Sequence, residues 1–469
     1  MRLSSKLVAA VGLSTVLVTT ACSGAGGAGG VGGGGGGAAD NSINVLMVNN
    51  PQMLALQKHI GDFTKESGIT VNFTVKPEND MRNQASQEFA NQSGQFDVAT
   101  LSNFEVPFYS KNGWLTPLSD IPAYKSDTTF NQDDIFPSMT KSLTGPDGKI
   151  YGEPFYGESS FLMYRKDIAD KVGVKFNETP TWDEVAAAAA KMDGAESGMK
   201  GICLRGLPGW GEVFAPLTTV VNTFGGTWFD KDWNAQVNAQ PFKDATTFYT
   251  NLVKEHGEAG AAQAGFAECL TATTQSKVAM WYDATSAAGS LEAPDSPVKG
   301  KMAYVQAPVK ETKASGWLYA WSWMIEKKST KADNAWKFIS WASSQKYEEL
   351  VGAQDGWATV PAGKRESTYK NPEYIKAAAA FAEPTRKAIE AADPTNPGVQ
   401  PRPTVGIQFV DIPEFTDFAT KISQDVSSVI AGKKTVDEAL NNGQKLAQAA
   451  GDKYKGKWSR RGRVASSLV

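Results

Sequence analysis

The chain has 469 residues, of which 41% are hydrophobic and 21% charged, and its formal net charge at pH 7 is −3. This length and composition predict a globular protein of at least two domains. A charge so close to neutral argues against nucleic acid as a partner. The chain has only two histidines, neither close to a cysteine or to the other. We therefore expect no metal site, no cofactor and no histidine-dependent catalytic triad.

The N-terminus has the features of an export signal. Arg2 and Lys6 precede an apolar run at residues 7–18, which is too short to span a bilayer. The small residues just before Cys22 resemble a bacterial lipobox, with Thr19 at its first position. We expect a signal peptide at 1–21 and a lipid on Cys22 that anchors the protein, outside the cytoplasm, to the cell membrane. A cleaved signal followed by an incidental cysteine is the alternative.

Two low-complexity segments flank the body of the chain. Residues 24–39 are nearly all glycine and alanine, which predicts a flexible tether within a segment at 22–42. Residues 459–469 form a basic tail that we expect to be disordered, and contact with anionic envelope material is the alternative. Between them no run of about 20 apolar residues occurs, so passage of a solute across a membrane needs a separate protein.

Short β-branched or aromatic runs alternate with helical segments in the body. Residues 43–48 and 71–75 are typical of strands, and 54–67 between them are typical of a helix. This order predicts an α/β architecture. Thr181 and Thr435 each precede a glutamate by three residues, which is the capping-box pattern of a helix start.

If Cys22 carries lipid, Cys203 and Cys269 remain in an oxidising compartment, where pairing is expected. We predict a disulfide between them. Two buried free thiols are the alternative, because the sequence does not give their separation.

Several blocks together resemble the extracellular solute-binding proteins of ABC sugar importers, over nearly the whole body: QFDV (95–98), EVP (105–107), GESSF (157–161), YRKD (164–167) and AWKFI (335–339). A further set is similar to the sorbitol- and mannitol-binding members: GICLRG (201–206), PGWGE (208–212), NTFGG (222–226), MWYDAT (280–285), GWA (356–358) and GIQFV (406–410).

The resemblance implies a periplasmic-binding-protein-like type II fold, with two α/β lobes and a ligand cleft between them. We expect lobe one to hold 43–158 and 318–365, and lobe two to hold 159–317 and 366–458. It also implies a monomer that closes on a linear polyol, delivers it to the transmembrane subunits of an ABC permease, and is not an enzyme.

A polyol pocket needs aromatic faces for C–H surfaces, and carboxylates and amides for hydroxyl groups. Of the 13 tryptophans, Trp210 and Trp321 are our candidates for the cleft. Trp210 follows a Pro-Gly turn that gives it little helical or strand context. Trp321 shares one face of an expected strand with Trp323, and alternation alone does not say which of the two faces the cleft.

Asp283 is the strongest polar candidate, because it follows the apolar run 278–282 where open α/β sheets place ligands. Its carboxylate is expected to accept from two adjacent hydroxyls, and an N-cap role for the next helix is the alternative. Glu158, Glu105 and Arg205 complete the charged set. Arg205 either forks onto vicinal hydroxyls or holds a carboxylate in place. Position in the resembling motifs adds five polar residues: Asn50, Asn79, Tyr156, Asn222 and Gln408.

Three other functions remain as alternatives. A secreted carbohydrate-active enzyme could use Glu105 and Glu158 as acid and base. A binding protein for a disaccharide differs only in pocket length. A binding protein for a phosphorylated polyol would favour several basic groups, and Arg205 is the one basic group near the expected cleft.

Overall fold

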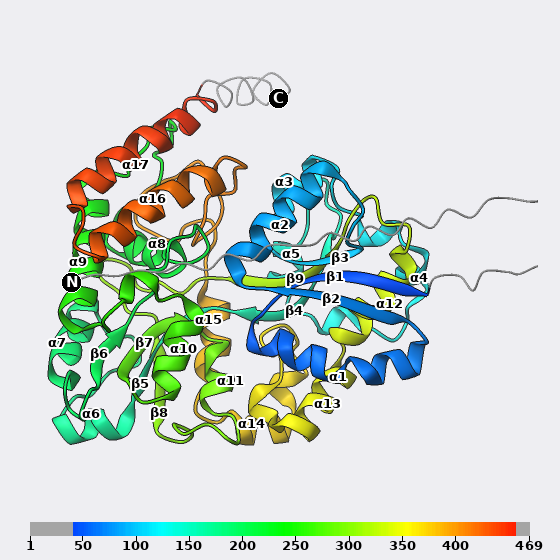
Figure 1. The fold of residues 1–469 in the computed structure, drawn as a ribbon, viewed down its shortest axis with the longest axis horizontal. Coiled ribbons are helices and arrows are strands. Elements are labelled where there is room, and N and C mark those ends of the chain that lie inside the picture. The colour runs from blue at the N-terminus through cyan, green and yellow to red at the C-terminus, as the bar shows by residue number, and fades with distance from the viewer. Residues whose placement is uncertain (1–40, 456–469) are drawn as a thin grey trace, which may run out of the picture. The chain divides into compact units, whose positions relative to one another are not determined.

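The computed structural model describes residues 41–455 (Figure 1). The expected signal peptide, Cys22, the glycine-rich run at 24–39 and the tail at 459–469 lie outside the described residues. The described residues belong to one compact unit, which contains a five-stranded and a four-stranded sheet. Helices accompany both sheets, so the predicted α/β class is confirmed.

The first sheet has the strand order β2-β1-β3-β9-β4. β1 runs parallel to β2 and β3, whereas β9 runs antiparallel to β3 and β4. β3, β4 and β9 are buried along their whole length, as expected for strands covered on both faces. The strands are β1 (Ser42–Val48), β2 (Thr70–Lys76), β3 (Val98–Ser102), β4 (Gly152–Glu158) and β9 (Tyr319–Ile325).

Helices α1 (Pro51–Ser67), α2 (Glu78–Asn91) and α12 (Ala332–Ala342) pack against this sheet. α1 begins three residues earlier than the sequence pattern indicated, because Pro51 occupies the first turn, where its missing N–H is not needed. α2 follows directly on β2, so its first turn lies at the carboxyl end of a parallel strand. That edge is where α/β sheets present groups to a ligand.

The second sheet has the order β6-β7-β5-β8, with β5 antiparallel to both of its neighbours and β6 parallel to β7. The strands are β5 (Ser160–Arg165), β6 (Lys200–Cys203), β7 (Val278–Ala284) and β8 (Met302–Gln306). β7 is buried throughout and carries Asp283 next to its last residue. Figure 1 shows the two sheets side by side, each within its own group of helices.

The chain passes from the first sheet to the second between Glu158 and Ser160, and β9 returns it to the first sheet after β8. At the first crossing Ser159 and Thr285 exchange two hydrogen bonds, from Ser159 N to Thr285 Oγ1 (3.2 Å) and from Thr285 N to Ser159 O (2.8 Å). Gly157 lies so close to Gly363 that a Cβ atom would come within 2.1 Å of the Gly363 carbonyl oxygen. The crossings leave one cleft between two α/β lobes, as the expected fold requires.

The remaining helices complete the lobes. α16 and α17 pack against each other and against α9, and Figure 1 shows them at one end of the second lobe. They are α3 (Val106–Lys111), α4 (Pro122–Ser126), α5 (Pro137–Ser142), α6 (Lys166–Val172), α7 (Trp182–Met192), α8 (Phe214–Thr223), α9 (Gln240–His256), α10 (Phe266–Thr274), α11 (Ala287–Leu291), α13 (Gln345–Val351), α14 (Pro372–Ala377), α15 (Ala382–Ala391), α16 (Phe415–Ile430) and α17 (Val436–Gly451).

Two local predictions can be compared with the structure. Thr181 and Thr435 cap α7 and α17 with complete capping boxes, which confirms the sequence pattern. Cys203 at the end of β6 is joined by a disulfide to Cys269 of α10, with the two Cα atoms 5.7 Å apart. This bond ties a strand end near the cleft to the helix that covers it.

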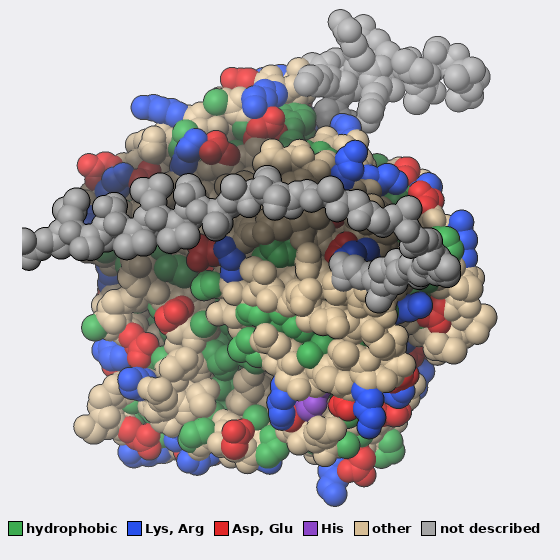
Figure 2. Space-filling model, turned by 45° about the vertical axis from the view of Figure 1, so that its right-hand side comes forward, with side chains coloured by type: hydrophobic (Ala, Val, Ile, Leu, Met, Phe, Trp, Pro, Cys, Tyr) green, Lys and Arg blue, Asp and Glu red, His purple; other side chains and the backbone are tan. Residues whose placement is uncertain are grey.

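No helix within residues 41–455 is both long enough and apolar enough to cross a membrane. Figure 2 shows acidic and basic side chains interspersed over the described part of one face. This mixture agrees with the near-neutral net charge of the chain.

Candidate ligand cleft

A group of buried charged side chains fills the cleft between the lobes. We call it the inner cluster: Glu78, Arg82, Glu105, Glu158, Arg205, Glu212, Asp283 and Tyr319. Of these, Arg82, Glu105, Glu158, Arg205, Glu212, Asp283 and Tyr319 have 5% or less of their surface exposed. The two lobes touch here, since a Cβ atom on Gly211 would lie 2.8 Å from both Arg82 Nε and Glu78 Oε1.

Arg82 of α2 organises the part of the cluster that belongs to the first lobe. Its guanidinium donates to Glu78 Oε1 (2.9 Å), Glu105 Oε1 (3.1 Å) and Tyr319 Oη (2.5 Å). The guanidinium also lies 4.3 Å from the ring centre of Trp210 and 4.7 Å from that of Trp321. Burial opposes its charge, but the phenol and the two carboxylates outweigh burial and raise the pKa of Arg82. Arg82 is therefore a fixed cation between aromatic faces of both lobes.

Arg205, in the loop after β6, organises the part that belongs to the second lobe. It forks onto Asp283, with Nε to Oδ2 at 2.8 Å and Nη2 to Oδ1 at 2.6 Å. Its Nη1 also donates to Glu212 Oε2 (3.3 Å). Of the two roles open from the sequence, the structure shows Arg205 holding a carboxylate in place.

Asp283 differs from its expected role as a direct acceptor for ligand hydroxyls. Besides Arg205, the Trp281 indole N–H donates to Oδ2 (3.1 Å) and the Ala284 backbone N–H to Oδ1 (2.7 Å). A carboxylate has about four acceptor sites, so protein donors already use them all. Asp283 also lies inside β7 and caps no helix in this structure. In this structure its carboxylate fixes the position of the Arg205 guanidinium.

Two carboxyl groups of the cluster are shifted towards the protonated form. Burial raises the pKa of Glu158 to about 8, although a hydrogen bond from Ser286 and the charge of Arg205 oppose the shift. Burial, together with the charge of Glu78, raises the pKa of Glu212 to about 8. A protonated carboxyl both donates and accepts, as does a ligand hydroxyl, so both groups can pair with hydroxyls in either direction.

These shifts predict that the free energy of unfolding decreases as the pH rises from 5 to 9. A glutamate whose pKa is raised by folding stabilises the folded state fully below its ordinary pKa, and this contribution is lost as the pH rises through about 8. Thermal unfolding across this range should show a declining melting temperature. The double variant Glu158→Gln with Glu212→Gln should flatten the decline. The remaining part is due to Glu153, Glu326 and Asp411, because burial also raises their pKa values, to about 8, about 7 and about 6. A wild-type melting temperature that rises over this range would contradict the assignment.

Direct hydrogen bonds between the lobes show that the cleft is closed. Asn79 Nδ2 donates to the Pro208 carbonyl (2.9 Å), and Gln52 Nε2 donates to the Ser286 carbonyl (3.1 Å). Ser286 in turn donates to Glu158 Oε2 (2.6 Å). The closed form is therefore stabilised by contacts that involve the cluster itself.

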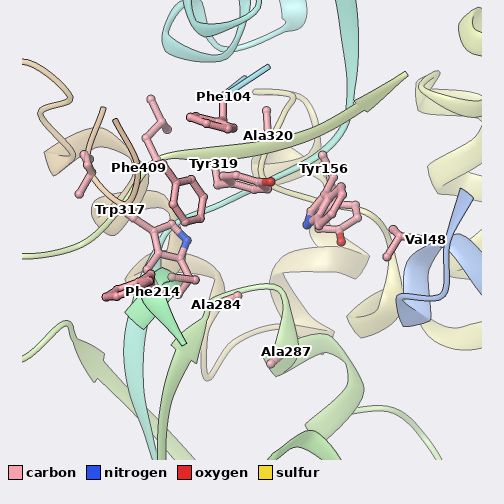
Figure 3. Packing of buried hydrophobic residues seen from close by; sticks show 14 of the residues in the cluster. Val48, Phe104, Tyr156, Phe214, Ala284, Ala287, Trp317, Tyr319, Ala320 and Phe409 are labelled. Atoms are coloured by element: carbon pink, nitrogen blue, oxygen red, sulfur yellow. The ribbon is translucent and has the colours of Figure 1, made fainter. Parts of the chain in front are cut away.

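Aromatic rings form one wall of the cleft. Phe104 lies 4.8 Å from Trp210 and 5.4 Å from Phe409, centre to centre, and Tyr319 lies 6.1 Å from Phe409. In Figure 3 the rings of Phe104, Tyr319 and Phe409 gather at one place, and the Tyr319 hydroxyl points towards Tyr156. Behind Trp321 on the same strand, Trp323 packs instead on Phe338 of α12. Trp321 therefore lies at the cleft and Trp323 in the core of the first lobe, a distinction that alternation along the strand does not make.

A cavity of about 440 Å³ lies on the other side of this aromatic wall. We call it the outer cavity. The first lobe contributes Asn103, Phe104, Pro107, Ser138, Lys141, Ser142, Thr144, Leu318 and Tyr319, and the segment 392–411 contributes Ala392, Asp393, Pro394, Thr395, Val405, Gly406, Ile407, Gln408, Phe409 and Asp411.

The structure brings most of the candidate residues together and separates others. Asp283, Arg205, Glu158 and Glu105 are in the inner cluster, with Trp210 and Trp321 against Arg82. Asn50 lies beside the cluster and donates to Tyr156 Oη (2.8 Å). Asn79 bridges the lobes, and Gln408 lines the outer cavity. Asn222 of α8 binds the segment 392–411 instead, donating to the Ile407 carbonyl (2.9 Å) and accepting from Arg402 (2.9 Å).

Sequence reasoning missed Glu78, Arg82, Glu212 and Tyr319. Glu78 and Arg82 are spaced four residues apart, which on a helix normally indicates a solvated surface pair. The one available signal was their place at the start of the helix that follows β2. Within residues 41–455 no group of three or more His, Cys, Asp or Glu side chains is arranged to hold a metal ion.

Residues 49–349 match the family of bacterial extracellular solute-binding proteins, and the chain belongs to that family. Its place of work is therefore outside the cytoplasm. The chain is 37% identical over 403 residues to a mannitol-binding protein of Pseudomonas aeruginosa, an alignment that covers 85% of this chain and 90% of that protein.

Solved structures agree with this assignment. An ABC transporter solute-binding protein from Agrobacterium vitis with bound D-mannitol has a TM-score of 0.85 and 41% identity, over 88% of this chain and 99% of its own. One from Agrobacterium radiobacter in complex with ribitol has a TM-score of 0.77 at 22% identity, over 87% of this chain and 98% of its own, and supports the fold alone. The expected two-lobed fold is thereby confirmed.

Proposed function

We propose that this protein is the substrate-binding lipoprotein of an ABC importer and captures a linear polyol, such as mannitol or sorbitol, in the cleft between its lobes. The observation that carries the proposal is the inner cluster, which combines buried carboxyl groups able to pair with hydroxyls and fixed arginines beside aromatic faces. Its similarity to the mannitol-binding relatives supports the same ligand class.

Capture follows from closure. The ligand contacts groups from both lobes, so it binds the closed form better and shifts the population towards it. We place lobe one at 43–158 and 318–365 and lobe two at 159–317 and 366–458, with the crossings as hinges. The permease subunits then recognise the closed form. Lipid on Cys22 keeps the protein at the membrane.

The cluster is suited to binding without turnover. Glu105, which a glycosidase would need as a free carboxyl, accepts from Arg82 (3.1 Å) and from the Ser102 backbone N–H (2.9 Å). Both of its oxygens thus have fixed protein donors. A phosphorylated polyol is disfavoured because the two arginines are already paired with carboxylates. We therefore assign the protein no catalytic activity.

Titration calorimetry tests the proposal. The purified protein should bind mannitol or sorbitol saturably, with a dissociation constant of about 1 μM, or about −8.2 kcal/mol. Glycerol 3-phosphate, which the cluster disfavours, is the matched negative ligand. Binding of neither hexitol would refute the polyol assignment, and release of reducing sugar from oligosaccharides by the pure protein would refute the absence of catalysis.

A further inference from the structure

The outer cavity has an apolar floor and an accessible mouth. Phe104 and Phe409 are buried and form the aromatic wall inside it. At the mouth Asp393 is exposed, and Val405 has 52% of its surface accessible. The volume of about 440 Å³ lies within the range of about 300–1,000 Å³ typical of pockets that bind compact ligands. The cavity can therefore hold a side chain or a short stretch of another segment.

Two carboxyl groups of the lining have no basic partner. Asp411 accepts from the Val405 backbone N–H (3.2 Å), and Asp393 accepts from two backbone N–H groups of its own turn (2.8 and 3.1 Å). Burial raises the pKa of Asp411 to about 6, and no basic side chain within residues 41–455 opposes this shift. Lys141 is the single basic residue of the described lining. Because a nearby cation stabilises a partly buried carboxylate, the cavity favours a positively charged occupant.

The end of the described chain lies beside this mouth. α17 ends at Gly451 and runs along α16 (Figure 1). Tyr454 Oη then donates to Glu414 Oε2 (2.6 Å), directly before α16. Burial, this hydrogen bond and the charge of Asp411 together raise the pKa of Tyr454, so Tyr454 and Asp411 are near neighbours. The chain from residue 456 onward therefore starts next to a residue that lines the outer cavity.

Residues 456–469 carry side chains that complement the cavity. Trp458 is followed by three arginines within five residues, and the segment contains no acidic residue. An extended chain advances about 3.3–3.6 Å per residue, so Trp458 reaches about 10 Å from Lys455 and Arg461 about 20 Å. A segment of this composition buries too little apolar surface to fold alone, but it can order against a matching surface. The indole matches the aromatic wall, and the guanidinium groups match the two carboxylates.

We propose that the C-terminal segment 456–469 docks in the outer cavity, with Trp458 against its aromatic wall and the arginines paired with Asp393 and Asp411. Because both lobes line the cavity, the docked segment bridges them and favours the closed form. The partner of this surface is therefore part of the same chain, whichever ligand the cleft between the lobes holds.

A fluorescent peptide of residues 456–469 tests the docking by anisotropy titration. Protein of residues 41–455 contains the whole described lining and should bind the peptide saturably, with a dissociation constant of about 0.1 mM or lower. A short tether gives a tail an effective concentration of about 1 mM, so a tail of that affinity occupies its own cavity about 90% of the time. Protein of residues 41–469 should therefore bind the peptide about tenfold more weakly.

Protein variants show whether the peptide binds in this cavity. Asp393→Asn with Asp411→Asn should weaken peptide binding at least about tenfold. Asp62→Asn with Asp244→Asn removes the same charge from exposed positions outside the cavity and should change binding less than about twofold. Ser138→Trp keeps every charge and fills the cavity from α5, so it should weaken binding as much as the loss of the two carboxylates does.

Hydrogen exchange tests the bridge between the lobes. Amides of α5 in the first lobe and of the segment 392–411 in the second should exchange more slowly in protein of residues 41–469 than in protein of residues 41–455. Slower exchange in only one of the two regions, or in neither, overturns the bridge.

The peptide variant Trp458→Ala keeps the test independent of how the protein variants fold, and it should bind at least about tenfold more weakly than the unchanged peptide. Equal affinity of the two peptides overturns the proposal, as does a folded Ser138→Trp variant that binds like the wild type. If the peptide binds vesicles of phosphatidylglycerol but not the protein, the segment contacts anionic lipid and the outer cavity is not its site.

Discussion

Arg205→Met is expected to destabilise the protein by about 3–5 kcal/mol, because it leaves the carboxylate of Asp283 buried without its cation. Asp283 is fully buried, and two of its four hydrogen bonds come from Arg205. The charge of Arg205 also lowers the pKa of Glu158 against the effect of burial. Loss of Arg205 therefore affects the carboxyl groups of Asp283, Glu158 and Glu212 at once. Equilibrium denaturation with urea measures the change.

The double variant Arg205→Met with Asp283→Leu separates stability from binding. Replacing a buried ion pair by apolar residues of similar volume is often close to neutral for stability, so the double variant should recover most of the loss. Polyol binding should nevertheless be weaker in the double variant than in the wild type, because Glu158 and Glu212 have lost the cation that faces them. If the double variant bound the polyol with wild-type affinity, the ion pair between Arg205 and Asp283 would contribute to folding and not to binding.

The alternation of strands and helices was predictable because each element buries its own apolar face. The residues at 43–48, 54–67 and 71–75 form β1, α1 and β2 with small shifts at their ends. Thr181 and Thr435 were predictable for a similar reason, since a capping box involves only residues three apart. Such local patterns are complete within a few residues of sequence.

The inner cluster was predictable only in part. Asp283 was found because it ends an apolar run, but its saturation by Arg205 depends on a contact 78 residues away in sequence. Arg82 and Glu78 are a common helical pair until lobe closure buries them against Gly211. The position of the segment 392–411, which forms the outer cavity, follows from tertiary contacts such as that between Asn222 and Ile407. Long-range packing of this kind has no periodic signal in the sequence.

Trp210→Ala is expected to weaken polyol binding at least about tenfold, or about 1.4 kcal/mol. Trp210 belongs to the second lobe but lies 4.3 Å from the Arg82 guanidinium of the first, so it joins the lobes only when the cleft is closed. It also forms the wall between the inner cluster and the rings of Phe104 and Phe409. The alanine variant removes this closure contact and admits water beside Arg82, and calorimetry with mannitol measures the result.

Two control variants make this result specific. Trp210→Phe keeps an aromatic face over Arg82 and should retain most of the affinity, since a cation–π contact contributes about 0.5–2 kcal/mol and phenylalanine keeps part of it. Trp336→Phe, in α12 beside Tyr124 and Phe130, lowers stability at a site away from the cleft and should leave the affinity of the folded protein unchanged. If Trp210→Ala binds mannitol as the wild type does, the ligand does not depend on the contact between Trp210 and Arg82, and the closed cleft must be held by the polar bridges of Asn79 and Gln52 instead.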